Sequence, residues 1–272
     1  MSKLKYKLIV SDLDGTLLNN KAQLTERTIE AIKQYHKAGG LFTYATGRTV
    51  ESSQVFVERL GIKIPGIAFN GAKVVSYIDN RVIYETFLDG ECAKKAYTAF
   101  RAHDKDVVVY FDDSRYVAEY TSVIDKYLER VRHSVIIVRN IEQVIGRGES
   151  LKKILVIDPK QEEELILGIV KPIFGENINY IKSDSQYYEF LAPGTSKGYA
   201  LEALAKYLGI SLDDTIAIGD HMNDISMINT AGLGVAVANA EQETIDAADY
   251  ITTSNDNDGV ALTIEKLLRG EL

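Results

Sequence analysis

The sequence predicts an α/β protein, in which a doubly wound parallel sheet carries an inserted α+β domain. Along both ends of the 272-residue chain, short apolar runs alternate with amphipathic segments, as in buried parallel strands joined by helices. Between about residues 85 and 184 the pattern changes to helices mixed with hairpins, which is typical of a separate α+β unit. We therefore expect a core made of residues 1–84 and 187–272, with residues 85–186 inserted between its two halves.

The N-terminal part reads as alternating strands and helices. Thr25 is suited to cap the N-terminus of the first helix and Gly39 to terminate it. The apolar runs on either side of this helix predict buried strands, because they contain few charges and are short. In chain order, we expect strand 6–12, helix 25–40, strand 41–47, helix 49–61, strand 66–72 and a hairpin over 72–85.

The inserted segment and the C-terminal part follow different patterns. Inside the insertion we expect helix 91–103, strands 106–113 and 115–121, helix 122–131, strand 134–139, a short helix, strand 152–158, a helix after Pro159 and strand 177–184. After residue 194 the alternation of the N-terminal part resumes. There we expect helix 196–209, strand 215–220, helix 224–232, strand 233–240, helix 242–248, strand 250–253 and a helix ending near Arg269.

Composition excludes several classes of function. The net charge of -8, from 39 acidic and 31 basic residues without a basic block, gives no attraction to nucleic acid or anionic lipid. No apolar run approaches the roughly 20 residues that span a bilayer, so we do not expect a membrane protein. Cys92 is the only cysteine, which excludes an intrachain disulfide and a thiolate metal cluster and favours a cytoplasmic protein. Local groups or a metal must therefore hold any anionic substrate.

Polar side chains stand where the predicted strands end. The stretch "LIVSDLDGTLL" runs from apolar residues into Asp12 and Asp14, Thr46 follows the second strand, Asn70 lies at the end of the third, and Asp220 follows a later one. In an open parallel sheet, ligands bind outside the carboxyl ends of the strands. We therefore expect these residues to converge on one small site.

The acidic residues predict a magnesium site. Asp12, Asp14, Asp220 and Asp224 form an all-oxygen set, which suits a hard cation such as Mg²⁺. A calcium-binding EF-hand loop does not fit, because it needs Gly at its sixth position and Glu at its twelfth. A carboxylate beside Mg²⁺ can attack phosphorus, and a second one nearby can act as general acid and base.

Four motifs in this order carry a family resemblance. They are "DLDGT" at Asp12, "ATGR" with Thr46, "SKG" with Lys197 and "GDHMND" with Asp220, and together they resemble the haloacid dehalogenase superfamily of phosphohydrolases. "FNGA" at residues 69–72, "EFLAPGTSKGYAL" and "GVAVANA" are similar to its Cof-type branch, in which a large α/β cap lies between the second and third motifs. The resemblance covers essentially the whole chain and implies a Rossmann-like catalytic core, with the insertion as a cap that selects the substrate.

The resemblance implies roles for the acidic residues. Asp12 would be the nucleophile that becomes an aspartyl-phosphate and would also bind Mg²⁺. Asp14 would be the general acid and base and would offer its backbone carbonyl to the metal. Asp220 would complete the metal site, while Asp224 would support the metal through water or orient Lys197.

The resemblance also implies which residues hold the substrate. Lys197 would neutralise the phosphoryl charge, and Asn223 would contact the phosphate. Thr46, with the backbone amides of Leu13 and Gly47, would hold the phosphoryl oxygens. The expected function is a Mg²⁺-dependent phosphatase for a small phosphorylated metabolite, such as a sugar phosphate or a similar phosphomonoester.

Alternatives remain open at this stage. A phosphomutase of the same superfamily shares the "DxDGT" pattern, and it differs only in whether water or a substrate hydroxyl attacks the phosphoenzyme. A non-catalytic sugar-phosphate sensor on the same fold would be favoured by loss of Asp12 or Lys197, and both are present. Each motif alone also has a structural explanation, since Asp and Gly favour tight turns and Thr46 or Thr49 can cap a helix. The sequence does not indicate the oligomeric state.

Overall fold

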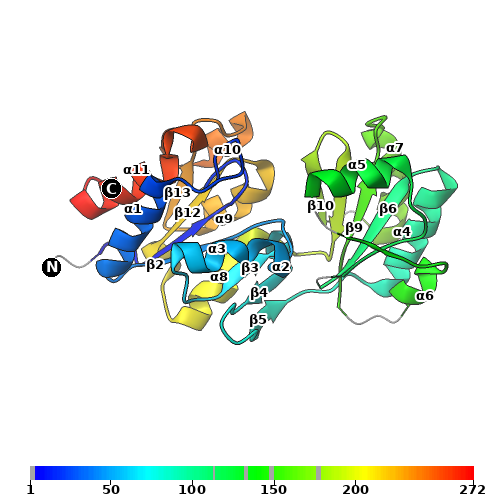
Figure 1. Cartoon of the computed structure of the whole chain (residues 1–272), viewed down its shortest axis with the longest axis horizontal. Helices are drawn as coiled ribbons and strands as arrows, with labels where there is room; N and C mark the ends of the chain where they lie inside the picture. The colour runs from blue at the N-terminus through cyan, green and yellow to red at the C-terminus, as the bar shows by residue number, and fades with distance from the viewer. Residues whose placement is uncertain (1–3, 113, 132–133, 147–149, 176–178) are drawn as a thin grey trace. The chain divides into compact units, whose positions relative to one another are not determined.

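The computed structural model describes residues 4–112, 114–131, 134–146, 150–175 and 179–272, and the chain forms two compact units (Figure 1). The first unit comprises Met1–Glu85 and Ser196–Leu272, and the second comprises Thr86–Thr195. In the described ranges no helix is both long and apolar enough to cross a membrane.

The first unit contains a parallel sheet of five strands in the order β14-β13-β12-β1-β2. After β1 the chain passes to β2 on one side, and the later strands are added on the other side. This creates a switch in strand order between β1 and β12, the position where such sheets bind ligands. The strands of this sheet are β1 (Leu8–Ser11), β2 (Leu41–Tyr44), β12 (Thr215–Gly219), β13 (Leu233–Ala236) and β14 (Tyr250–Ile251).

Helices cover both faces of this sheet, so the predicted doubly wound class is confirmed. Ile9 packs against buried side chains of α1 and α11, which lie together on one face (Figure 1). Leu8 and Val10 pack on the other face against α8 and α9. The helices are α1 (Glu26–Lys37), α2 (Val50–Ser53), α3 (Val55–Leu60), α8 (Lys197–Leu208), α9 (Ile225–Thr230), α10 (Gln242–Ala247) and α11 (Gly259–Arg269).

The capping residue at the start of α1 is correctly predicted from the sequence. The second predicted helix is not continuous in the structure. Thr25 caps α1 as predicted, because its hydroxyl oxygen accepts a hydrogen bond from the backbone N–H of Thr28 at 3.1 Å. The helix expected over 49–61 is instead two short helices, α2 and α3, which meet at Gln54.

The third predicted strand leaves the main sheet. Only β3 (Gly66–Ala68) is extended, and it pairs antiparallel with β4 (Lys73–Val75), which pairs with β5 (Val82–Glu85). Its link to the main sheet among the described residues is a parallel bridge between Ala45 and Ile67. The described part of this unit also contains four short 3₁₀ segments, which are far apart in the chain: η1 (Phe69–Gly71), η2 (Leu212–Asp214), η3 (Met222–Asp224) and η4 (Asn255–Asn257).

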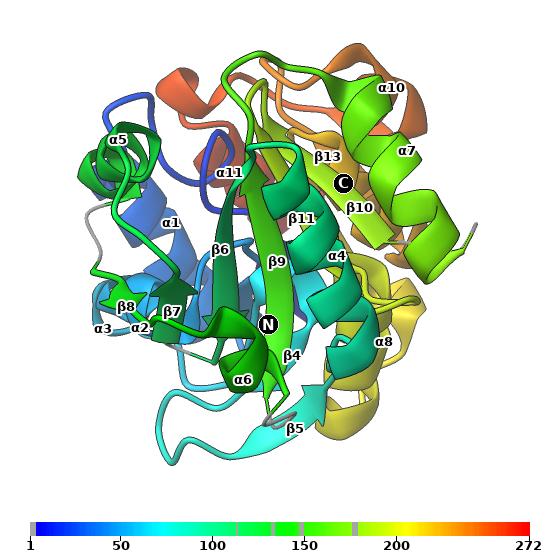
Figure 2. The ribbon, with the colours of Figure 1, turned by 90° about the vertical axis from the view of Figure 1, so that its right-hand side faces the viewer.

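The second unit is a mainly antiparallel sheet in the order β10-β11-β9-β6-β7-β8. Figure 2 shows α4 and α7 in front of its strands, and Phe100, Ile154 and Val156 are buried between these layers. Its strands are β6 (Asp106–Phe111), β7 (Ser114–Val117), β8 (Ile136–Ile137), β9 (Leu151–Ile157), β10 (Asn179–Asp184) and β11 (Tyr187–Leu191). Its helices are α4 (Gly90–Ala102), α5 (Ser122–Val131), α6 (Ile141–Ile145) and α7 (Glu163–Phe174).

One predicted boundary differs from the structure. The sequence pattern predicts that residues 187–195 belong to the core, but they lie in the second unit, where residues 187–191 form β11 and pair with β9 and β10. Tyr188 and Phe190 are buried in that unit's core, which explains why this strand belongs there. The predicted strand 177–184 is found as β10, and residues 177–178 lie outside the described part of the chain.

Candidate active site

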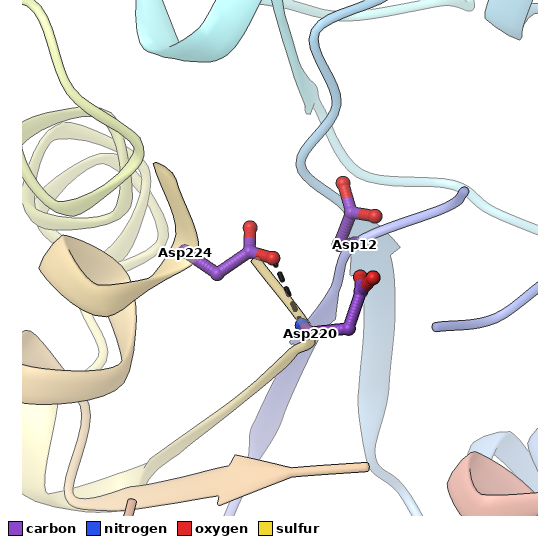
Figure 3. Close-up of side chains that lie close together, drawn as sticks. All are labelled: Asp12, Asp220 and Asp224. Atoms are coloured by element: carbon purple, nitrogen blue, oxygen red, sulfur yellow. Dashed lines mark hydrogen bonds between the residues drawn. The ribbon is translucent and has the colours of Figure 1, made fainter. Parts of the chain in front are cut away.

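Three carboxylates meet at the switch in strand order. Asp12 directly follows β1, Asp220 directly follows β12, and Asp224 lies in η3 (Figure 3). One carboxylate oxygen from each of them lies within 4.8 Å of the other two. Asp12 and Asp224 are buried, so this cluster of negative charge has little water around it. Such a cluster requires positive charge in or beside it.

Lys197 supplies part of that positive charge. It is the first residue of α8 and only 1% exposed, and its Nζ donates to Asp12 Oδ1 and to Asp224 Oδ1, both at 2.6 Å. The hydroxyl oxygen of Ser196 caps the helix by accepting from the backbone N–H of Tyr199 at 3.2 Å. The predicted closeness of Lys197 to the acidic residues is therefore present in the structure.

Both oxygens of Asp224 are engaged. Its Oδ1 accepts from Lys197, and its Oδ2 accepts from the backbone N–H groups of Asp220 at 3.0 Å and His221 at 3.1 Å. Figure 3 shows the bond to the Asp220 N–H. These contacts fix Asp224 beside Lys197, a geometry suited to orienting the lysine.

The pKa values of Asp12, Asp220 and Lys197 reflect an excess of negative over positive charge in this site. Burial raises the pKa of Asp12 well above its usual value, and the charges of Asp224, Asp220 and Asp14 raise it further, although Lys197 opposes them. Burial and the charge of Asp224 raise the pKa of Asp220 to about 6. Burial alone would lower the pKa of Lys197, but the two carboxylates outweigh it and raise the pKa. One ammonium thus faces three carboxylates.

This donor set fits Mg²⁺. All candidate ligand atoms are carboxylate oxygens, and the charge of a bound cation would oppose the burial and repulsion that raise the pKa values of Asp12 and Asp220. His221, which lies between the ligands in sequence, has its Nε2 3.0 Å from Glu241 Oε1. The imidazole is therefore engaged with Glu241 beside the carboxylate cluster.

Arg48 holds the carboxylate of Asp14. Its Nε donates to Asp14 Oδ2 at 2.7 Å and its Nη2 to Asp14 Oδ1 at 2.5 Å, a bidentate pair. Burial opposes the charge on the guanidinium, but the hydrogen bonds to Asp14 outweigh it and raise the pKa of Arg48. The side chain of Asp14 remains 54% exposed, so it is accessible to a substrate. This pair connects the loop after β1 with the loop after β2.

The remaining predicted residues line the same loops. Thr46 is buried, and its hydroxyl oxygen accepts from the backbone N–H of Arg48 at 3.1 Å. Asn223 donates through Nδ2 to Oδ1 of Asn70 at 2.9 Å, and a Cβ on Gly47 would lie 2.9 Å from that same oxygen. The side chain of Leu13 is buried in the core of the first unit. The roles of these residues toward a phosphoryl group remain predictions.

Two residues of this site are not in the predicted set, although both lie inside its motifs. Arg48 ends "ATGR", and Thr16 ends "DLDGT" and donates from Oγ1 to Asp220 Oδ1 at 2.6 Å. The motifs could have indicated that these residues lie nearby. The partners could not be read from the sequence, because 34 and 204 positions separate the bonded residues.

Comparisons with known proteins give a consistent result. A family model described as haloacid dehalogenase-like hydrolase matches residues 9–264. The chain is 34% identical to YxeH of Bacillus subtilis (strain 168), over 97% of this chain and 98% of that protein. It is 30% identical to the 5-amino-6-(5-phospho-D-ribitylamino)uracil phosphatase YwtE of the same organism, over 97% and 99% of the two chains. A crystal structure of a haloacid dehalogenase-like hydrolase from Bacteroides thetaiotaomicron superposes with a TM-score of 0.85 at 27% identity, covering 96% of this chain and 99% of that one.

Proposed function

This chain belongs to the haloacid dehalogenase-like hydrolase family and is a phosphatase, and we propose that it cleaves a small phosphomonoester with Asp12 as nucleophile and Mg²⁺ as cofactor. The observation that carries this proposal is the charge balance of the buried site. Three carboxylates have oxygens within 4.8 Å of one another, and the ammonium of Lys197 pairs with two of them, Asp12 and Asp224. When all four groups are ionised their charges sum to -2, and a divalent cation would bring the site to neutrality before the phosphoryl group binds.

Asp12, Asp14 and Lys197 have different roles in the proposed phosphoryl transfer. A carboxylate oxygen of Asp12 attacks phosphorus, and the bond from phosphorus to the leaving oxygen breaks. Asp14 gives its proton to that oxygen and afterwards takes a proton from the water that attacks the aspartyl-phosphate, which releases phosphate and restores Asp12. Lys197 holds Asp12 in place and offsets negative charge on the phosphoryl oxygens.

The metal site consists of Asp12 and Asp220, with the backbone carbonyl of Asp14. Mg²⁺ bound there supplies positive charge that offsets the charge of the transferring phosphoryl group. We assign Asp224 the role of orienting Lys197, because both its oxygens already accept hydrogen bonds from the protein. Thr46, Asn223 and the amides of Leu13 and Gly47 are proposed to hold the phosphoryl oxygens. The second unit is proposed to select the substrate.

The proposed substrate is a small phosphorylated metabolite of the cytoplasm, such as a sugar phosphate. The relative YwtE is named for a substrate whose phosphate sits on a ribityl chain, which is a polyhydroxylated leaving group. The net charge of -8 gives the protein no general attraction for anions. The side chains and backbone groups of the site must therefore hold the phosphate, which supports a small substrate.

The test is phosphate release from a panel of sugar phosphates and other phosphomonoesters, with Mg²⁺ and with a chelator. We expect release that requires Mg²⁺ and that Asp12→Asn abolishes without loss of fold, because a carboxamide is a poor nucleophile toward phosphorus. Ordinary turnover by the Asp12→Asn protein, with contamination excluded, would contradict the mechanism. If phosphate moves to a second hydroxyl of the substrate, the protein is a mutase. Binding of sugar phosphates without turnover would make it a sensor.

A further inference from the structure

We propose that Asn239 and Asn255, neither of which is among the predicted site residues, are positioning residues that hold the loop after β1 in the shape the metal site requires. The inference rests on the proposed function, because it concerns how the same site is built. It starts from the close approach between this loop and Asp220.

The loop after β1 is tightly wound and lies against Asp220. The backbone N–H groups of Leu17 and Leu18 both donate to the carbonyl of Leu13, at 3.1 and 2.8 Å. Gly15 has a φ of +85°, and a Cβ there would lie 2.3 Å from Asp220 Oδ2. A small shift of the loop therefore changes the space available to the Asp220 carboxylate.

Asn239 connects this loop to the segment that follows β13. Its Nδ2 donates to the carbonyl of Gly15 at 2.8 Å, and its Oδ1 accepts from the backbone N–H of Asn255 at 2.8 Å. Its amide therefore bridges two backbone groups that lie 240 positions apart in the chain, at Gly15 and Asn255.

Asn255 holds the far end of the same loop. Its side chain is 4% exposed, and its Nδ2 donates to the carbonyl of Leu18 at 3.0 Å and to Oδ1 of Asn20 at 3.1 Å. A buried amide that loses these partners leaves polar groups without hydrogen bonds, which is more costly than the loss of an exposed contact. The two asparagines thus fix the loop at Gly15 and at Leu18.

The loop after β1 and the segment that contains Asn239 both form hydrogen bonds with Asp220. Thr16, which lies between the two held carbonyls, donates from Oγ1 to Asp220 Oδ1 at 2.6 Å. On the other side, the backbone N–H of Glu241, two residues after Asn239, donates to the Asp220 carbonyl at 2.9 Å. The chain therefore forms a closed ring of hydrogen bonds from Asn239 through Gly15 and Thr16 to Asp220 and back through Glu241. This ring fixes the orientation of a proposed Mg²⁺ ligand.

The test measures Mg²⁺ binding by calorimetry without any substrate, in the full chain and in Asn255→Ala and Asn239→Ala. We expect both variants to bind Mg²⁺ about three- to tenfold more weakly, since each loses one or two hydrogen bonds that hold the loop. Hydrogen exchange at the amides of Leu17 and Leu18 should become faster in the metal-free variants. Activity should need more Mg²⁺ and approach the wild-type rate at saturation.

Two further variants make the test specific. Asn257→Ala changes an exposed asparagine in the same 3₁₀ turn, whose Nδ2 donates to Ser254 Oγ at 2.7 Å, and it should leave Mg²⁺ affinity unchanged. Asn255→Asp keeps the shape but replaces the donor by an oxygen, so it should behave like Asn255→Ala.

The outcomes separate this inference from the proposed function. Wild-type Mg²⁺ affinity in both folded alanine variants overturns the inference and leaves the proposed function intact. If Asn255→Ala does not fold, the exposed Asn239→Ala decides the question alone. A wild-type protein that binds no Mg²⁺ overturns the proposed cofactor, and the inference with it.

Discussion

Asp14 shows at the scale of a single residue what the structure adds to the motif. The sequence places a second carboxylate two positions after the proposed nucleophile, and the structure shows that Arg48 grips it through two hydrogen bonds of 2.7 and 2.5 Å. A general acid must meet the leaving oxygen in the correct geometry, so the residue that holds the acid should affect proton transfer. Arg48 is therefore the residue at which this role can be tested without removing the acid itself.

We predict that Arg48→Lys slows phosphate release from substrates with poor leaving groups about tenfold, because lysine keeps the charge but cannot hold a carboxylate in bidentate fashion. Release from aryl phosphates, whose leaving groups need little protonation, should change much less. The measurement is kcat for an alkyl and an aryl phosphate in both proteins. Arg27→Lys is the matched control, since Arg27 makes a bidentate pair with Glu265 through two 2.9 Å bonds on α1 and α11. Equal slowing for both leaving groups would contradict a role through Asp14.

The raised pKa of Asp220 predicts how Mg²⁺ binding depends on pH. The carboxyl has a pKa of about 6 without metal, so below that pH the cation must displace a proton. Mg²⁺ affinity should therefore fall as the pH decreases from about 7 to about 5. Calorimetry in buffers of different ionisation enthalpy should show proton release in this range. Equal affinity at both ends of the range would contradict the assignment of Asp220 as a ligand.

The raised pKa of Asp220 also makes the free energy of unfolding depend on pH. Because the folded pKa of Asp220 lies above its usual value of 3.8, the folded state binds this proton more tightly than the unfolded state. The contribution of Asp220 to the free energy of unfolding is present at low pH and is lost as the pH rises from about 4 to about 6. Added Mg²⁺ should therefore raise the melting temperature more at neutral pH than at about pH 5.

At the scale of elements, the position of α8 depends on one close approach. Gly71 has a φ of +98°, and a Cβ there would lie 2.1 Å from the carbonyl oxygen of Ser196 and 2.9 Å from the backbone nitrogen of Lys197. The turn η1 therefore packs directly against the N-terminus of the helix that carries Lys197. Any larger residue at position 71 must displace either the turn or the helix.

We predict that Gly71→Ala lowers both the melting temperature and the rate of phosphate release. Gly209, at the other end of α8, is the matched control, because its φ of +67° causes similar backbone strain while nothing lies within 4 Å of a Cβ there. Gly209→Ala should cost about 1 kcal/mol from the left-handed backbone alone and leave the rate unchanged. Equal effects of the two substitutions on melting temperature and rate would show that the contact with Ser196 is unimportant.

The elements also show how much of the fold the sequence could predict. Apolar runs followed by Asp12 or Asp220 predicted strands that end at the site, because burial and turn chemistry are local signals. The membership of Tyr187–Leu191 in the second unit was missed, since it depends on pairing with β9 and β10. The contacts of Asn239 and Asn255 with the loop after β1 depend on pairing in the same way, because their partners there, Gly15 and Leu18, are more than 200 positions away in sequence.

The two units of the whole molecule have separate hydrophobic cores. Buried residues of α1, α8 and α11 pack within the first unit, and those of α4 and α7 pack within the second. The three carboxylates, Lys197 and the Asn239–Asn255 connection all belong to the first unit. The two ends of the second unit lie next to each other, because the hydroxyl oxygens of Thr86 and Thr195 are 2.8 Å apart. A short linker can therefore join Glu85 to Ser196.

We predict that a chain in which a short Gly-Ser linker replaces residues 86–195 folds and binds Mg²⁺ with an affinity close to that of the full protein. This follows because every proposed ligand and the lysine that balances them remain. The same chain should lose the ranking among phosphomonoesters that the full protein shows, since the second unit is proposed to select the substrate. Circular dichroism and thermal unfolding test the fold, calorimetry tests Mg²⁺ binding, and phosphate release from the panel tests selectivity. A folded core that keeps the full protein's ranking would place selectivity in the first unit, whereas a folded core without Mg²⁺ binding would show that residues 86–195 help to form the metal site.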